Sequence, residues 1–463
     1  MSEEAPVSLF DRFTAHLPVV EAPIAKKLDF ATKLKWTLIV LVSYFVLKHV
    51  PLFGLGASAL AQFQSLSVLL GADFGSLLSL GIGPIVTGSI ILQLLNGSGM
   101  LKFDLTTHAG KARFQGMNKV FSYFFLIFES FIFVFMGGLT PDPLLKGTSL
   151  FVGLELALVA QLILGGFLII LLDDLVSKWG IGSGISLFIA AGVSESLFIQ
   201  LFSPFTTTGS DYMVGAIPSM FQALARADGS TLALSIAGVL ATVFVFMLVV
   251  YFQSMKAEIP LSFGRVRGMG IRWPLNFLYT SNTPVILVAA LLANVRLGAY
   301  FIQNRFGADS AVNLANWFSP PHLLRSLITG GSFIIGWEPY LQALFYLAIM
   351  MIGSLIFSWF WMQTSGMDAK SQAKTIMGSG LQIPGFRNDP RIIEHILSRY
   401  IGPLTIMGGL TVGFLSAIAD ISGAVVSGTG LLLSVMIVYK FYEDIARQHM
   451  VDMNPAMRKF MGR

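Results

Sequence analysis

The stretch from Leu234 to Phe252 reads LSIAGVLATVFVFMLVVYF and contains no acidic, basic or histidine side chain. A helix needs roughly 20 mainly apolar residues to cross the hydrocarbon core of a bilayer. We therefore predict a membrane-spanning helix here. The same signal recurs along the chain and predicts ten spans, at about 34–50, 76–95, 114–137, 150–172, 185–202, 234–252, 284–300, 341–361, 401–419 and 424–442.

The composition of the whole chain agrees with a protein that folds in lipid. Of its 463 residues, 54% are hydrophobic and only 12% are charged, and the mean hydropathy is +0.74. The apolar runs lack the period-two alternation of a membrane β-barrel. The predicted fold class is an all-α membrane protein. The absence of cysteine excludes disulfides and thiolate metal sites.

The basic residues predict the orientation of the spans. With the N-terminus in the cytoplasm and ten crossings, most of the 30 Lys and Arg residues fall in the cytoplasmic tails and loops. Positive residues concentrate on the cytoplasmic side of membrane proteins. We therefore expect a multi-pass protein with both termini in the cytoplasm. The basic residues left on the outside are Lys48, Lys146, Arg226, Arg296, Arg305 and Arg325.

The predicted spans divide into two halves of five. Because each half crosses the membrane an odd number of times, the halves must be inverted relative to one another, a plan that recurs in proteins with a central passage. We expect a cytoplasmic amphipathic helix within 1–33, a first half over 34–205, an external hinge over 206–231, a second half over 232–446 and a cytoplasmic tail over 447–463. Residues 54–75 are interrupted by polar side chains and are interpreted as an external loop or a short re-entrant helix.

Groups that would carry bond chemistry are sparse. The sequence contains no phosphate-binding loop and no His-Glu-x-x-His pattern, and it predicts no cofactor, no metal site and no enzymatic activity. Glu129 is the one acid expected in the middle of a span, where a carboxylate is a functional candidate, and Asn294 is the comparable neutral residue. The Asp173-Asp174 pair at a helix end is interpreted as solvated or paired with Lys178.

Six short motifs carry a resemblance to a known family. They are LGIGPIVTG at 80–88, WGIGSGI at 179–185, FIAAG at 188–192, IPLS at 259–262, SNTPVI at 281–286 and GTG at 428–430. In order and spacing they resemble SecY, the central subunit of the protein translocation channel, in its archaeal and eukaryotic type. The resemblance implies ten spans in two inverted halves around a central pore, with residues 54–75 as a plug.

The resemblance also implies residue roles. A ring of apolar side chains would close the pore: Ile82, Val86, Ile185, Ile189, Ile286 and Leu433. A lateral gate between spans two and three and spans seven and eight would carry Thr87, Glu129 and Asn294. The cytoplasmic loops 254–281 and 363–400 would dock ribosomes, with Arg265, Arg267 and Arg387 as candidate contacts to ribosomal RNA.

The implied function is a channel that translocates secretory polypeptides and inserts membrane proteins laterally. The partners that the resemblance implies are SecE, a small beta subunit, the ribosome, signal sequences, nascent chains and lipids, in the plasma membrane. From the residues alone, an inverted-repeat secondary transporter is the alternative, and it requires coupling carboxylates near the midplane. An intramembrane enzyme would require catalytic or metal-ligating sets within the spans.

Overall fold

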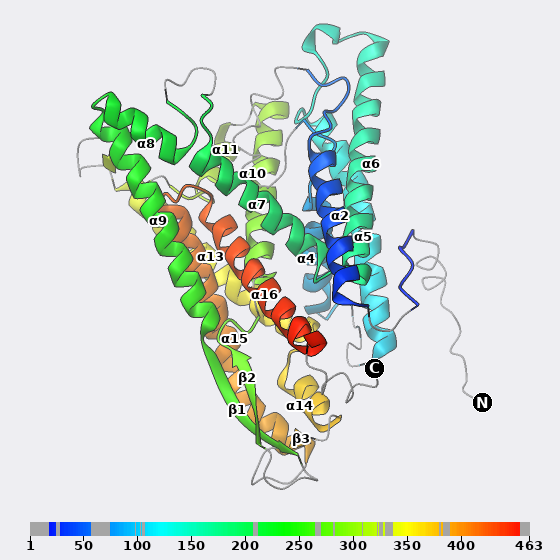
Figure 1. Ribbon diagram of the computed structural model, residues 1–463. Helices are drawn as coiled ribbons and strands as arrows, with labels where there is room; N and C mark the ends of the chain where they lie inside the picture. The colour runs from blue at the N-terminus through cyan, green and yellow to red at the C-terminus, as the bar shows by residue number, and fades with distance from the viewer. Residues whose placement is uncertain are drawn as a thin grey trace.

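In the computed structural model, described residues are 18–24, 28–56, 75–97, 99–101, 103, 107–206, 212–263, 270–280, 283–307, 309–321, 323, 327–328, 337–378, 381–382 and 389–453. Helices dominate (Figure 1), which confirms the predicted class. The predicted amphipathic helix within 1–33 and the end of the tail lie largely outside these residues, as do the three candidate arginines and most of 54–75.

A helix lies at each of the ten predicted spans. Within the described part of the chain, eight helices are long and apolar enough to cross a membrane: α2 (Phe30–Lys48), α5 (His108–Phe135), α6 (Ser149–Trp179), α7 (Gly184–Phe202), α9 (Gly229–Ser254), α10 (Thr283–Phe306), α13 (Glu338–Thr364) and α15 (Pro390–Ile421). The other two predicted spans correspond to α4 (Gly83–Gly97), which is shorter, and α16 (Gly428–Met453), which carries charged residues in its second half.

Local sequence explains where several helices begin. The Thr107 side chain accepts a hydrogen bond from the Gly110 amide at the start of α5, and Asp389 accepts one from the Arg391 amide at the start of α15. Asp228 caps α9 by accepting from the amides of Ser230 and Thr231. Such caps satisfy amides that have no partner inside the helix.

Two hydrophobic clusters separate the molecule into two packed bodies. One cluster is built mainly from α2, α4, α5, α6 and α7, around fully buried Leu158, Leu162 and Ile169. The other is built mainly from α9, α10, α13, α15 and α16, around Met350 and Leu432. Ile82 and Ile185 pack against both clusters. The two bodies therefore meet where the predicted pore residues lie.

The structure departs from the predicted loops in two places. Within 254–281, β1 (Lys256–Phe263) pairs antiparallel with β2 (Gly270–Asn276), and β1 also pairs with β3 (Leu381–Gln382). Within 363–400, α14 (Ala369–Gly378) forms, and α15 already begins at Pro390. A third cluster, which includes Ile259, Leu275 and Ile393, packs the hairpin against α14 and α15. The chain therefore adds a small sheet to the expected helices.

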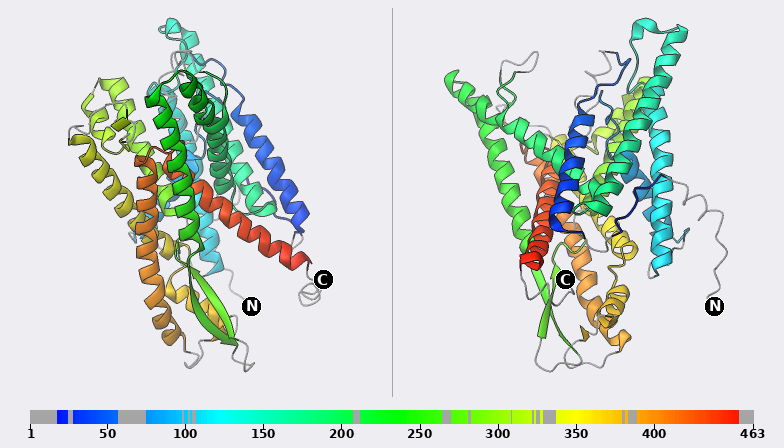
Figure 2. Two further views of the ribbon diagram at one scale, coloured as in Figure 1. Left: turned by 60° about the vertical axis from the view of Figure 1, so that its left-hand side comes forward. Right: turned by 45° about the vertical axis from the view of Figure 1, so that its right-hand side comes forward.

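This small sheet projects beyond one end of the helix bundle (Figure 2), beside α14 and the beginning of α15. At the opposite end lies α8 (Ala216–Ala225), a helix inside the stretch that was predicted as a hinge. The smaller helix α11 (Asp309–Asn316) and the 3-10 turn at Pro143–Leu145 lie in connections between spans. The hinge stretch and the sheet thus lie at opposite ends of the bundle.

Candidate functional site

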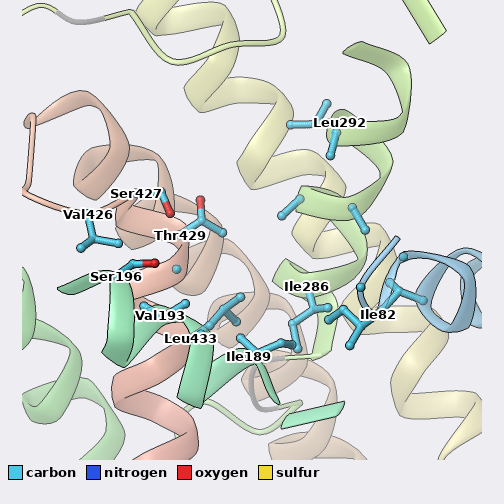
Figure 3. Close-up of a pocket in the computed structure, with 18 of the residues that line it drawn as sticks. Ile82, Ile189, Val193, Ser196, Ile286, Leu292, Val426, Ser427, Thr429 and Leu433 are labelled. Carbon is cyan, nitrogen blue, oxygen red and sulfur yellow. The ribbon is translucent and has the colours of Figure 1, made fainter. Parts of the chain in front are cut away.

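A cavity lies at the junction of the two packed bodies. Residues of α4, α7, α10 and α16 line it, together with single residues of neighbouring helices. The cavity volume is about 170 Å³. Figure 3 shows Leu433, Ile189, Ile286 and Ile82 gathered along one side of it, with Ser196, Ser427 and Thr429 on another. The cavity therefore has an apolar part and a polar part.

Five of the six residues predicted for the ring line this cavity. They come from four parts of the chain: Ile82 and Val86 from the turn before α4 and its first turn, Ile189 from α7, Ile286 from α10 and Leu433 from α16. We name these five the apolar waist. Val86 and Leu433 are almost fully buried. The sixth, Ile185, is half-buried and packs into both hydrophobic clusters instead of lining the cavity.

The position of Ile82 differs slightly from the prediction. It lies in the turn before α4, which begins at Gly83, and its carbonyl accepts the first helical bond from the Val86 amide at 3.1 Å. Residues four apart on a helix lie on one face, so Ile82 and Val86 still reach the same cavity. Both residues therefore line one cavity although Ile82 lies outside the helix.

The polar part of the cavity was not foreseen from the sequence. Asp420, at the end of α15, accepts a hydrogen bond from the Tyr346 hydroxyl at 2.8 Å and from the Thr429 amide at 3.1 Å, and it also accepts one from the Thr429 hydroxyl. Arg296 of α10 is buried beside this group and lines the same cavity. The sequence analysis placed Arg296 outside the membrane, because basic residues near span ends ordinarily reach water. Its burial was therefore not predicted.

The three residues predicted for the lateral gate come together. The Asn294 side-chain amide of α10 donates a hydrogen bond to the Thr87 hydroxyl of α4 at 3.0 Å, and Thr87 also forms a side-chain hydrogen bond with Glu129 of α5. We name this group the polar seam. It joins α4 and α5 of the first body to α10 of the second. Side chains more than 200 positions apart in sequence thus meet in one cluster.

A buried ion pair on the first body was also not predicted from the sequence. Lys48 was counted among external basic residues, but its side chain is only 8% exposed, and its Nζ lies 2.5 Å from an Oε of Glu195. The pair joins the end of α2 to α7. Charged side chains are rarely buried without such a partner. The ion pair therefore fixes α7, one of the cavity helices, against α2.

The two adjacent acids at the end of α6 have different partners. Asp174 pairs with Lys178, as expected, and also with Lys119 of α5, both at 2.9 Å. Asp173 instead accepts a hydrogen bond from the Ile185 amide at the beginning of α7. The sequence treats the two acids alike, whereas the structure separates a largely buried acid with two lysine partners from an acid that contacts a cavity helix.

Outside the membrane-spanning segments, the base of the hairpin is held by Tyr279. Its hydroxyl donates to the Met367 carbonyl at 2.7 Å, and burial raises the pKa of this phenol well above its ordinary value. The candidate arginines Arg265, Arg267 and Arg387 lie outside the described residues, but the elements on either side of them are described: β1 and β2 for the first two, β3 and α15 for the third. Among the residues that the structure describes, no group of three metal-ligating side chains occurs.

Comparison with known proteins identifies the family. The SecY family model matches residues 76–442. The protein translocase subunit SecY of Methanothermobacter thermautotrophicus is 42% identical over 98% of this chain and 98% of its own length.

Solved structures agree with the sequence comparison. A protein-conducting channel is similar over 96% of this chain and 99% of its own, with a TM-score of 0.80 and 37% identity. Sec61 in a canine ribosome–channel complex is similar over the same shares, with a TM-score of 0.77. These matches decide against the transporter and the intramembrane enzyme. By sequence and by fold, the chain belongs to the SecY family and is a multi-pass, protein-conducting channel subunit that translocates proteins.

Proposed function

We propose that the apolar waist is the closure of the channel and that a polypeptide crosses the membrane through it. The observation that carries this proposal is the convergence of five aliphatic side chains from four parts of the chain on one cavity. A narrow apolar constriction resists wetting and so blocks ions without a charged filter. Aliphatic side chains without fixed hydrogen bonds also adapt to a threaded chain of any sequence.

A crosslinking experiment tests this route. A photoreactive amino acid is placed at Val86 or Ile189, and a stalled, radiolabelled nascent secretory chain is engaged with the assembled complex. Both positions should crosslink to the nascent chain. The Leu240 side chain on α9 is 62% exposed, so it serves as the control that should react with lipid. Crosslinks at Leu240 but at neither waist position would contradict the route.

We propose that the polar seam is the contact that closes the channel toward lipid. It joins the first body to the second through Thr87, Asn294 and Glu129. A hydrophobic signal sequence or membrane segment that separates the bodies here would leave for the bilayer, as lateral insertion requires. The energy needed to break the seam would then set how hydrophobic such a segment must be.

Residues 54–75 are proposed as the external plug. Their ends are described and lie together: the Leu52 amide donates to the Gly75 carbonyl at 2.8 Å, and Pro51 bridges to Ser76. The Gly56 amide also donates to the Thr140 carbonyl at 2.9 Å. A segment whose two ends are fixed at one place returns to that place after displacement, as a resealing element must.

We propose that the small sheet positions the ribosome-binding segments. The segment with Arg265 and Arg267 follows β1, and the segment with Arg387 follows β3. Because β1 and β3 are neighbouring antiparallel strands, the two segments follow adjacent strands of one sheet. Arginines are suited to bidentate phosphate contacts, and a relative of similar fold is solved in a ribosome–channel complex.

The test of ribosome binding is charge reversal. Arg387→Glu should weaken co-sedimentation with ribosomes, and binding of the unsubstituted protein should fall as salt increases, because phosphate contacts release counterions. Arg391→Glu, on the described first turn of α15, is the matched control for net charge. Binding that ignores both the substitution and the salt concentration would reject the proposal.

The partners and orientation complete the proposal. A SecE-like subunit and a small beta subunit would assemble with this chain in the plasma membrane, with both termini in the cytoplasm. Since the chain has no cysteine, one cysteine introduced at Ser2 or Arg463 is a unique label. An impermeant maleimide should modify it only in inverted membrane vesicles, and labelling of intact cells would overturn the orientation. Co-purification of two small membrane proteins tests the assembly.

A further inference from the structure

Two cavity helices, α7 and α16, cross in opposite directions. Near the beginning of α7, a Cβ atom added at Gly182 would meet the Phe441 ring of α16, and near the beginning of α16, one added at Gly430 would meet Val193 of α7. The start of each helix therefore lies against the later part of the other. Figure 1 shows the same antiparallel crossing. These helices carry Ile189 and Leu433 of the apolar waist.

The beginning of α7 is capped from another helix. Its own preceding residue, Ser183, makes no side-chain cap. Asp173 of α6 instead accepts hydrogen bonds from the Ile185 amide, at 2.9 Å, and from the Gly184 amide. The approach is close enough to exclude a side chain, because a Cβ atom at Gly184 would lie 2.5 Å from the Asp173 Cα.

The beginning of α16 repeats this arrangement at the opposite end of the crossing. Asp420, at the end of α15, accepts from the Thr429 amide at 3.1 Å and from the Gly428 amide. A Cβ atom at Gly428 would lie 2.1 Å from the Ala419 carbonyl carbon. In each body, then, an acid on the penultimate membrane helix binds the first amides of the last one, and a glycine permits the contact.

We infer that Asp173 and Asp420 are positioning residues of the pore, a matched pair of acidic caps that hold the two crossing helices in register at the waist. A carboxylate at a helix N-terminus binds both the unpaired amides and the positive end of the helix dipole. Each cap also keeps its pore helix attached to the preceding helix of the same body. The two bodies can then separate while α7 and α16, which carry Ile189 and Leu433, keep their positions within their own bodies.

The test distinguishes a role of the two caps in closing the pore from a general contribution to the stability of the fold. Asp173→Ala and Asp420→Ala are made in the full chain, and the purified complex is reconstituted in planar bilayers without substrate. Each variant should raise the resting ion conductance about five-fold, which is the change in an equilibrium constant that corresponds to the loss of a typical helix cap. Asp173→Asn and Asp420→Asn keep an acceptor oxygen and should give intermediate conductance.

The matched control is Asp228→Ala. Asp228 also accepts hydrogen bonds from the first amides of a helix, as the N-cap residue of α9 itself, but α9 contributes no residue to the cavity lining. This variant should lower the thermal stability of the complex and leave the resting conductance unchanged. Equal conductance in Asp173→Ala, Asp420→Ala and the unsubstituted protein would overturn the inference, as would an equal rise in Asp228→Ala. Should the alanine variants not assemble, the two asparagine variants decide, and unchanged conductance in both rejects it.

This inference rests on the proposed closure at the waist, and one reference variant separates the two. Serine at all five waist positions removes the apolar constriction itself. Leakage through that variant with tight aspartate variants rejects only the caps. A tight serine variant rejects the waist.

Discussion

The apolar waist and the polar seam are neighbours that are built from different kinds of contact. On α4 the adjacent residues Val86 and Thr87 belong to one each. The side chains of the waist are aliphatic and form no hydrogen bonds, whereas the seam is built from directed side-chain hydrogen bonds such as the one from Asn294 to Thr87. The waist should therefore tolerate conservative changes, and the seam should respond to single ones.

The largest effect is expected when the waist is made polar. Serine at Ile82, Val86, Ile189, Ile286 and Leu433, together with Ile185, should raise the resting ion conductance at least about ten-fold, because a wetted constriction conducts ions. The measurement is conductance of the purified complex in planar bilayers. Ile286→Val, which keeps the aliphatic character, is the control and should stay near the unsubstituted value. A tight serine variant would show that the barrier lies elsewhere.

A smaller effect, on stability alone, is expected at the Lys48–Glu195 pair. Lys48→Met leaves Glu195 without this partner and should cost about 2 kcal/mol, less than a fully buried pair, since the Glu195 side chain is 21% exposed. The unfolding temperature of the complex should fall, with resting conductance unchanged. Lys48→Met combined with Glu195→Leu should recover most of the loss. A rise in conductance would show that this pair, too, supports the waist.

At the seam, a single hydrogen bond is the unit of change. Asn294→Leu and Thr87→Val should each lower the hydrophobicity that a signal sequence needs, by an amount that corresponds to about 1 kcal/mol, a typical net contribution of one hydrogen bond. The readout is the export of a reporter with signals of graded hydrophobicity. Thr87→Ser keeps the hydroxyl and is the matched control. An unchanged threshold in both variants would remove the gate role.

The smallest effect is expected at the cap of α9, far from both waist and seam. Hydrogen bonds from Thr231, Tyr212 and Ser230 hold the pKa of Asp228 well below its ordinary value. Its stabilisation is thus present at neutral pH and is lost as the pH falls through this depressed pKa. Asp228→Asn should lower the unfolding temperature slightly at pH 7, and the difference should shrink toward acidic pH. A difference that grows with acid would contradict this sign.

Hydropathy alone predicted most of the fold, because a bilayer permits few ways to satisfy a backbone. The convergence of five waist residues and three seam residues followed from motifs that resemble a family. Both sets of functional roles stay predictions until tested. The hairpin was not predicted, because its strands lie in a connection between two strongly apolar spans.

The contacts that sequence could not foresee share one physical feature. Lys48 and Glu195 are 147 positions apart, and a lysine at the end of a span ordinarily reaches the interface. Asp173 and Asp174 are identical and adjacent, so only the packing of α5 and α7 tells the cap from the ion pair. Asp420 lies near the end of a span, and its partners come from other helices. Such pairings exist only after the helices have packed.

The hairpin connects several helices of the second body. It joins α9 to α10 directly, since β1 follows α9 and β2 ends at Asn276, just before α10 begins at Thr283. Its base packs against α14 and α15 through the cluster around Ile259 and Leu397, and Tyr279 hydrogen-bonds to the loop after α13. A force on the hairpin is therefore transmitted to α14 and α15 as well as to α10. We expect a partner that binds the hairpin to displace these helices together, and with them the residues of the waist and of the seam that they carry or contact.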